Sequence, residues 1–433
     1  MKKLAFIFML FTMVLLAACQ SGGTSNESKA NADSGGEENG GKIEINYWYA
    51  WGDKIGENNE NLAKMFNESQ DKYHVNAEFQ GTYDDLHAKT QAAFAAGNAP
   101  EVTLNEIASI GVFAKSGMTE NLTPFVEKDD IKMDDFNPGL MGNSYVDDKL
   151  YGLPYLRSTP ILYMNTTLLK EAGLDPAGPK DWKEFEEYAR KLTKKGERVG
   201  ISLPADIWFF EAFVAQSGGK MLSEDEKTAE FNGDAGVKAL EFWKKLAKEG
   251  VSKVPTGEKA GDLAKQDFAN GKAAMIFSST ADLSYQLSVS KEKGFEINTS
   301  FMPASDSYAV PTGGANLVMT AGLDKEKQEA AWEFIKFMTA KEQTIYASKY
   351  TGYLPSRLSA IDSEEMKTLY KEKPQFKVAV DQLQYGHARP MAEAYPEVVK
   401  VVVDEMNRSI LKDDVQPKDA LDAAAEKANQ LLK

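Results

Sequence analysis

The sequence predicts an α/β protein in which strands and helices alternate along the chain. Short segments rich in β-branched and aromatic residues alternate with longer segments whose apolar residues recur at helical spacing. The connections between these segments are only a few residues long, which favours mainly parallel sheets with helices on both faces. Because a single core stops growing at about 250–300 residues, we expect the 433-residue chain to form two lobes.

The first elements of the globular part follow this alternation. A strand is expected at Ile43–Tyr49, where apolar and polar residues alternate. A helix is expected over Asn58–Glu68, because Leu62, Met65 and Phe66 lie on one helical face. The next expected elements are a strand at His74–Phe79, a helix over Asp84–Ala96 that ends at Gly97, and a short strand at Val102–Leu104.

The second half of the chain repeats the pattern. Its expected strands are Val199–Leu203, Ala273–Phe277 and Gly314–Thr320. Its expected helices are Trp182–Leu192, Ala235–Glu249, Asp262–Asn270, Lys325–Met338, Tyr395–Ser409 and Pro417–Leu432.

The first eighteen residues predict a lipoprotein signal peptide, with Cys19 as the lipidated residue. Lys2 and Lys3 precede an apolar run that is too short to span a bilayer comfortably, and small residues stand before Cys19. A diacylglyceryl group and a further acyl chain such as palmitate would give stable anchoring to a bacterial cell membrane. Ordinary secretion is the alternative, but it would leave Cys19 as an odd free thiol in an oxidising compartment.

Residues 19–42 predict a flexible tether that follows the lipidated cysteine. Residues 20–41 contain no large apolar side chain, so they cannot bury enough surface to offset the entropy lost on ordering. A coil of this length reaches about 25 Å, which clears the lipid headgroups. The globular part is therefore expected to begin near Ile43 and to work outside the cytoplasm.

Charge and cysteine content narrow the range of partners. The formal net charge of −15 opposes nucleic acid or anionic lipid headgroups as partners held by a long-range field. The membrane contact should therefore come from the lipid anchor itself. No cysteine follows Cys19, so no disulfide is expected and stability has to come from core burial.

Several separated motifs resemble the extracellular solute-binding proteins of ATP-driven (ABC) importers for sugars and polyols. These motifs are GNAP at 97–100, YGLP at 151–154, STPILYMN at 158–165, EAGLDP at 171–176, NGKAAM at 270–275 and TGYLP at 351–355. Within that class, GTYDD at 81–85, PTGGAN at 311–316, VDEM at 403–406 and ALDAAAEKANQLL at 420–432 most resemble glycerol-3-phosphate-binding proteins.

The resemblance implies a two-lobed periplasmic-binding-protein-like fold with strands that cross between the lobes. The N-terminal lobe would comprise residues 43–153 and 315–360, and the C-terminal lobe residues 154–314 and 361–433. The crossings would fall near Gly152–Tyr155 and Val310–Gly314. A ligand would lie in the cleft between the lobes. Closure of the lobes around the ligand would give the protein a shape that the permease subunits recognise. The protein would be a monomer.

The resemblance also implies which residues lie at or beside the cleft. These are Tyr83, Glu106, Ser158, Trp208, Ser279, Thr280, Gly313, Gly314, Tyr353 and Arg389.

Three kinds of chemistry suit a phosphate at such a site. Backbone N–H groups approach an anion closely at Gly313 and Gly314, although a plain tight turn would also need glycine. Arg389 could grip a phosphate through two parallel hydrogen bonds, or it could be a solvated surface arginine. Ser279, Thr280 and Tyr353 could add hydroxyl donors, although Ser and Thr after a strand are usually helix caps.

The other candidates suit a polyol. Glu106 follows an expected strand and could accept hydrogen bonds from adjacent hydroxyls, or it could be a surface acid or a helix N-terminal charge. Tyr83 could reach the same hydroxyls or contribute only to packing. Trp208 offers a flat apolar face, but Ile207 stands about where glycerol-3-phosphate members have a second tryptophan. Trp48 and Trp51 could line the cleft, although strand aromatics are more often core.

The favoured function is capture of sn-glycerol 3-phosphate or a glycerophosphodiester for import, and the alternative is a neutral sugar or oligosaccharide receptor of the same family. A third hypothesis is that the protein is a surface adhesin or structural lipoprotein without a small-molecule ligand. No catalytic residue, cofactor or metal site is expected, because the three histidines stand in unrelated contexts and no nucleophile elbow or phosphate loop occurs. The paired carboxylates of a glycosidase stay an alternative, because their separation is not visible in a sequence.

Overall fold

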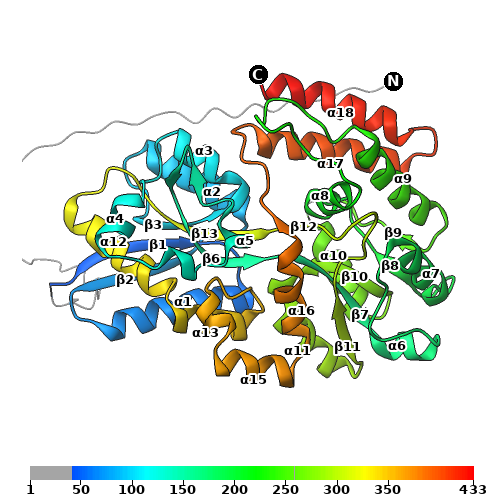
Figure 1. Cartoon of the computed structure of the whole chain (residues 1–433), viewed down its shortest axis with the longest axis horizontal. Coiled ribbons are helices and arrows are strands. Elements are labelled where there is room, and N and C mark those ends of the chain that lie inside the picture. Colours follow the sequence, from blue (N-terminus) through cyan, green and yellow to red (C-terminus); the bar gives the residue numbers. More distant parts are fainter. Residues whose placement is uncertain (1–40, 258) are drawn as a thin grey trace, which may run out of the picture. The chain divides into compact units, whose positions relative to one another are not determined.

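The computed structural model describes residues 41–257 and 259–433, which contain two five-stranded sheets (Figure 1). The expected signal peptide, Cys19 and most of the tether lie outside the described residues. The first sheet has the order β2 (Tyr73–Phe79), β1 (Ile43–Tyr49), β3 (Val102–Glu106), β13 (Gly313–Met319), β6 (Leu153–Ser158). The second has the order β11 (Ile297–Ser300), β7 (Pro160–Asn165), β10 (Ala273–Ser279), β8 (Val199–Ser202), β9 (Ser252–Lys253).

The α/β class is confirmed, but the expectation of mainly parallel sheets is wrong. In the first sheet β1 pairs in parallel with β2 and β3, whereas β13 runs antiparallel to both of its neighbours. In the second sheet β10 and β9 pair in parallel with β8, whereas β7 runs antiparallel to β10 and β11. The apolar pattern of a strand does not encode its direction, and β7 and β13 directly follow the points where the chain changes sheet.

The chain changes sheet at two short segments. Thr159 alone separates β6 of the first sheet from β7 of the second, so the first change lies after the Gly152–Tyr155 segment. The chain returns through β12 (Val310–Pro311), and Thr312 alone separates β12 from β13. Strand β12 pairs in parallel with β14 (Gly386–His387), which brings a late segment to this crossing. The residue ranges of the two expected lobes stay a prediction, since residues 41–433 form one compact unit.

Helices flank both sheets. They are α1 (Asp53–Ser69), α2 (Tyr83–Ala95), α3 (Ile110–Lys115), α4 (Thr123–Lys128), α5 (Pro138–Met141), α6 (Thr166–Glu171), α7 (Trp182–Leu192), α8 (Ile207–Gln216), α9 (Asp234–Lys248), α10 (Ala260–Ala269), α11 (Leu283–Lys293), α12 (Lys325–Met338), α13 (Lys341–Thr351), α14 (Leu358–Ile361), α15 (Glu364–Glu372), α16 (Gln375–Gln382), α17 (Tyr395–Leu411) and α18 (Pro417–Leu431). Strands β4 (Tyr145–Val146) and β5 (Lys149–Leu150) form a small hairpin.

Each strand and helix expected from the sequence is present, and most boundaries agree within two residues. The largest difference is α1, which begins at Asp53 rather than Asn58. The sequence pattern missed α8, because this helix is buried on nearly every side and so lacks an apolar stripe. Within the described residues, no helix is long and apolar enough to cross a membrane.

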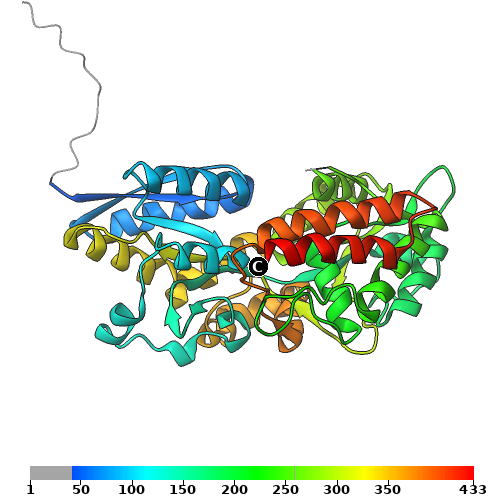
Figure 2. The same cartoon turned by 90° about the horizontal axis from the view of Figure 1, so that it is seen from above.

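Separate apolar cores support the two sheets. Tyr47 and Phe334 belong to the core of the first sheet, and their rings meet edge to face at 5.1 Å. Phe213 and Trp243 belong to the core of the second sheet, with their rings 5.3 Å apart. The C-terminal helices α17 and α18, orange and red in Figure 2, lie side by side and pack on α9. These cores hold the strand ends from which the candidate site is built.

Candidate functional site

Three candidate residues lie at one edge of the first sheet. Strand β3 ends at Glu106, β6 ends at Ser158, and β13 begins at Gly313. The register places Ser158 opposite Gly313 and Glu106 opposite Ala315. Their positions follow from the antiparallel course of β13, whose first residues lie beside the last residues of both neighbours. The carboxyl ends of strands are a common place for ligands in α/β proteins.

The second sheet brings two more candidates to the same place. Strand β10 ends at Ser279, opposite Pro160 at the start of β7. The Thr280 N–H donates to the Thr159 carbonyl at 3.1 Å, directly beside Ser158. The Ser279 Oγ accepts from the Ala281 N–H at 3.1 Å, so Ser279 does cap the short helix that follows. The Thr280 hydroxyl is buried and has no hydrogen-bond partner among the described residues.

Trp208 packs on the crossing between the sheets. It is the second residue of helix α8, whose N-terminus is capped by the Asp206 carboxylate accepting the Trp208 N–H at 2.8 Å. The indole Nε1 donates to the Thr312 carbonyl at 3.2 Å. A Cβ on Gly313 would lie 2.5 Å from the Trp208 ring, so this close approach requires glycine. Gly314 has a φ of +86°, which also favours glycine, so both glycines meet the needs of a tight turn.

Arg389 forms a buried ion-pair network with two glutamates. Its Nε and Nη2 donate to the two carboxylate oxygens of Glu211, each at 2.9 Å, and its Nη1 donates to Glu106 Oε1 at 2.9 Å. The Tyr395 hydroxyl donates to Glu211 Oε1 at 2.6 Å. The Arg389 side chain is 10% exposed and the Glu211 side chain 1%. We call Glu106, Arg389 and Glu211 the Arg389 cluster.

The electrostatics of the Arg389 cluster follow from burial and pairing. Burial raises the pKa of Glu106, and the charge of Arg389 opposes this shift. Burial lowers the pKa of Arg389, but the carboxylates of Glu211 and Glu106 outweigh it, so the net shift is well upward. With all three groups ionised the cluster carries a net charge of −1. The two carboxylate oxygens of Glu106 accept one hydrogen bond each and can each accept another, which suits ligand hydroxyls better than a phosphate.

This pairing differs from the sequence-based hypothesis that the guanidinium fork faces a phosphate. The carboxylate of Glu211 accepts both hydrogen bonds of that fork, from Nε and Nη2 of Arg389. The solvated-surface alternative for Arg389 is wrong, because the side chain is nearly buried, whereas contact of Arg389 with a phosphate stays an untested prediction.

Tyr83 and Tyr353 complete the set of ten candidates. Tyr83 begins α2, and its ring stacks on His87 with the centroids 6.2 Å apart. The His87 Nε2 accepts the Glu106 backbone N–H at 3.3 Å, which ties Tyr83 to the Arg389 cluster. The Tyr83 hydroxyl is buried, and the Tyr353 and Trp51 side chains lie close enough to it to interact. Tyr353 follows Gly352, where an added Cβ would lie 2.3 Å from the Thr280 carbonyl oxygen.

All ten candidates thus lie where the strand ends of the two sheets meet, and their role in ligand binding stays a prediction.

The sequence reasoning missed Glu211 and Arg157, which take part in the buried polar contacts here. Each is a single charged residue within an otherwise apolar helix or strand, and that pattern was the available signal. Of the two tryptophans that could line the cleft, Trp51 packs edge to face on Tyr83 at 5.4 Å, whereas Trp48 donates to Glu78.

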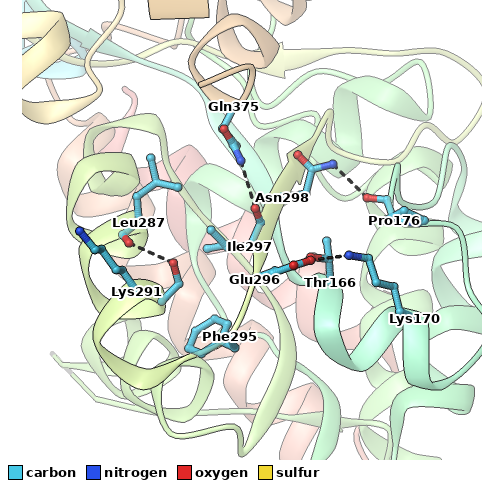
Figure 3. Close-up of a pocket in the computed structure, with 11 residues that line it drawn as sticks. Thr166, Lys170, Pro176, Leu287, Lys291, Phe295, Glu296, Ile297, Asn298 and Gln375 are labelled. Atoms are coloured by element: carbon cyan, nitrogen blue, oxygen red, sulfur yellow. Dashed lines mark hydrogen bonds and ion pairs between the residues drawn. The ribbon is translucent and has the colours of Figure 1, made fainter. Parts of the chain in front are cut away.

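A surface pocket of about 480 Å³ lies elsewhere and contains none of the ten candidates (Figure 3). Its polar groups bond one another: Lys170 pairs with Glu296, and the Asn298 amide donates to the Pro176 carbonyl at 2.9 Å. This pocket therefore leaves few groups that could hold a polar ligand. The described part of the chain also contains no group of three or more His, Cys, Asp or Glu placed to bind a metal ion.

Comparison with known proteins decides the family. Residues 61–378 match the family described as bacterial extracellular solute-binding protein. The chain belongs to this family. The sn-glycerol-3-phosphate-binding periplasmic protein UgpB of Escherichia coli strain K12 is 29% identical over 413 residues, covering 90% of this chain and 92% of that protein. The chain is thus an extracytoplasmic binding protein of an ABC importer, as its motifs indicated.

Solved structures agree with this assignment. UgpB from Mycobacterium tuberculosis in complex with glycerophosphocholine superposes with a TM-score of 0.80 at 25% identity, covering 90% of this chain and 99% of that one. The GacH receptor of Streptomyces glaucescens, known with acarbose, gives a TM-score of 0.81 at 21% identity, covering 90% and 98%. The second likeness shows the shared two-lobed binding-protein fold.

The buried His87 predicts a specific pH dependence of stability. Burial lowers the pKa of His87 to about 4, whereas an unfolded histidine titrates near about 6.5. The unfolded chain binds more protons between these values, so stability is lost as the pH falls through this window. Between pH 7 and 4.5 the wild type should lose about 2 kcal/mol more than His87→Gln, measured by urea unfolding. Equal losses in both proteins would contradict the assignment.

Proposed function

We propose that this chain is a lipid-anchored receptor that captures sn-glycerol 3-phosphate or a glycerophosphodiester and delivers it to its ABC permease. The ten candidates would be its ligand-binding residues. The observation that carries the proposal is the pairing, at one place, of a net-negative ion-pair cluster with the buried Thr280 hydroxyl, which has no partner among the described residues. The names of the UgpB relatives support the same ligand class.

The Arg389 cluster is suited to the hydroxyl end of such a ligand. The Glu106 carboxylate can accept hydrogen bonds from adjacent hydroxyls, and the guanidinium keeps two N–H groups beyond its three carboxylate bonds. Trp208 offers an apolar face for the carbon skeleton next to Gly313. We therefore assign Arg389 to the diol rather than to the phosphate.

The phosphate end belongs beside the strand ends at Ser158 and Gly313. The Thr280 hydroxyl is buried without a partner among the described residues, which is costly unless a ligand accepts from it, and the Tyr83 hydroxyl lies beside that of Tyr353. Phosphate oxygens are strong acceptors for such donors. Ser158 and Tyr353 add two more hydroxyls at the same place.

Calorimetric titration of residues 41–433, the compact unit, tests this proposal. We expect saturable binding of sn-glycerol 3-phosphate and glycerophosphocholine and none of maltose, since maltose offers no phosphate for the hydroxyl donors. Binding of maltose alone would keep the family assignment and overturn the phosphate ligand.

Two variants sharpen this titration. If the ligand diol binds at the Arg389 cluster, Arg389→Lys should weaken binding by about 2 kcal/mol or more, because it removes the two N–H groups left for the ligand and the guanidinium that holds Glu106 in place. Lysine keeps the positive charge between the two glutamates, whereas Arg389→Ala would leave them unpaired and destabilise the fold by about 3–5 kcal/mol. Trp208→Ala should also weaken binding, because it removes the apolar face next to Gly313, and a neutral sugar ligand predicts that this loss is the larger of the two. Thermal unfolding of both variants provides the control for folding.

The membrane anchor forms a separate part of the proposal, and it rests on residues 1–19. We expect wild-type cells to hold the protein in the membrane fraction and to label it with radioactive palmitate. The variant Cys19→Ser should lose the label and appear in the soluble extracytoplasmic fraction, since the acyl chains attach through this thiol. Retention of Cys19→Ser in the membrane fraction would contradict lipid anchoring at this residue.

A further inference from the structure

Arg157 is a fully buried cation that lies directly behind the candidate site. It belongs to β6, and its side chain is 0% exposed. Its Nε donates to the Gly313 carbonyl at 3.0 Å, its Nη2 to Thr312 Oγ1 at 3.0 Å, and its Nη1 to Asn316 Oδ1 at 3.2 Å and to the Leu140 carbonyl. All four acceptors are uncharged.

No carboxylate of the described residues forms an ion pair with Arg157. Glu106 and Glu211 both form their ion pairs with Arg389 instead, and Glu106 attracts Arg157 only through space. A buried charge without a counter-ion costs several kcal/mol, so such a group is rare unless another charge compensates it. Burial lowers the pKa of Arg157 to about 9, which still leaves the guanidinium charged at neutral pH.

The geometry places this charge close to the proposed phosphate position. Successive side chains of a strand point to opposite faces, so Ser158 faces the site while Arg157 lies behind it. The Arg157 guanidinium also bonds the carbonyl of Gly313, which is itself opposite Ser158 in the sheet. An anion at the Ser158–Gly313 edge would lie in the field of Arg157.

The charges around the site make Arg157 the cation that offsets the excess of carboxylate, because Glu106 and Arg157 attract each other through space. The Arg389 cluster carries a net charge of −1. Asp206 adds a further carboxyl group beside Trp208, and burial raises the pKa of this carboxyl group. The positive charge of Arg389 is already shared by two carboxylates. An anionic ligand therefore requires a second source of positive potential, and Arg157 is the cation whose hydrogen bonds go to neutral groups alone.

We propose that Arg157 determines the preference of this receptor for anionic ligands, by supplying the positive potential for the phosphate from behind strand β6 without touching it. This inference rests on the proposed function. Arg157 is then a specificity-determining residue that acts through the field at Ser158 and Gly313. A purely structural role, tying β6 to Thr312 and β13, would instead affect all ligands of the site equally.

Ligands of different charge separate these two roles. At pH 8 the phosphate of sn-glycerol 3-phosphate carries two negative charges, and the phosphodiester of glycerophosphocholine carries one. A fixed charge attracts the first group about twice as strongly as the second. Loss of the Arg157 charge should therefore weaken binding of the monoester more than binding of the diester.

The experiment is a calorimetric titration of both ligands at pH 8 with the wild type, Arg157→Met and Arg157→Lys. For Arg157→Met, the loss of affinity for sn-glycerol 3-phosphate should exceed the loss for glycerophosphocholine by about tenfold. Arg157→Lys keeps the charge and should largely restore this difference. Equal losses of affinity for both ligands in Arg157→Met would overturn the inference. So would an Arg157→Lys variant that loses as much affinity for the monoester, relative to the diester, as Arg157→Met does.

A second variant leaves Arg157 in place, in case Arg157→Met fails to fold. Asn316→Asp puts a carboxylate at the acceptor 3.2 Å from Arg157 Nη1 and so neutralises its charge, and it also removes the hydrogen bonds that the Asn316 amide donates to Asn143 and Ser144, a loss that should affect both ligands alike. It should show the same larger loss for the monoester, and Thr312→Val, which removes one acceptor without changing any charge, should not. Equal losses for the two ligands in Asn316→Asp would also overturn the inference. Wild-type protein that binds neither ligand would overturn the proposed function itself.

Discussion

The Arg389 cluster is the interaction on which the rest of the site depends. It joins Glu106 at the end of β3, Glu211 in α8 and an arginine that follows β14, so elements of separate parts of the chain meet at one guanidinium. The backbone of Arg389 is fixed as well, because Asn143 Oδ1 accepts its N–H at 3.1 Å and Asn143 Nδ2 donates to its carbonyl at 2.9 Å. Each partner is nearly buried, so removing one would leave the others without compensation.

This cluster divides the site into two ends with opposite electrostatic needs. Next to Glu106 and Glu211, the excess of carboxylate favours hydroxyl donors. Next to Ser158 and Gly313, the Thr280 hydroxyl, which has no partner among the described residues, and the field that we propose for Arg157 favour an anion. A small molecule with a diol at one end and a phosphate at the other satisfies both. A neutral sugar satisfies only the first, and that asymmetry is the physical reason for preferring the glycerol phosphate class.

The sequence allowed the α/β class and most elements to be predicted, because amphipathic periodicity is a local property. Strand direction was predicted wrongly, since the antiparallel course of β7 and β13 depends on where the chain changes sheet. The ten candidate residues came from a family resemblance, and the structure brings them together. The partners of Arg389 lie 283 and 178 residues away along the chain, so no local pattern could reveal that its fork is occupied. For the same reason the burial of Arg157 was not visible.

The central claim is that the hydroxyl end lies at the Arg389 cluster and the phosphate at the Ser158–Gly313 edge. A crystal structure of the complex with sn-glycerol 3-phosphate tests it most directly. The account predicts ligand hydroxyls within hydrogen-bond distance of Glu106 and Arg389, and phosphate oxygens within reach of the Thr280 and Tyr83 hydroxyls. A phosphate bound to the Arg389 guanidinium, with Glu106 or Glu211 displaced from it, would contradict the account.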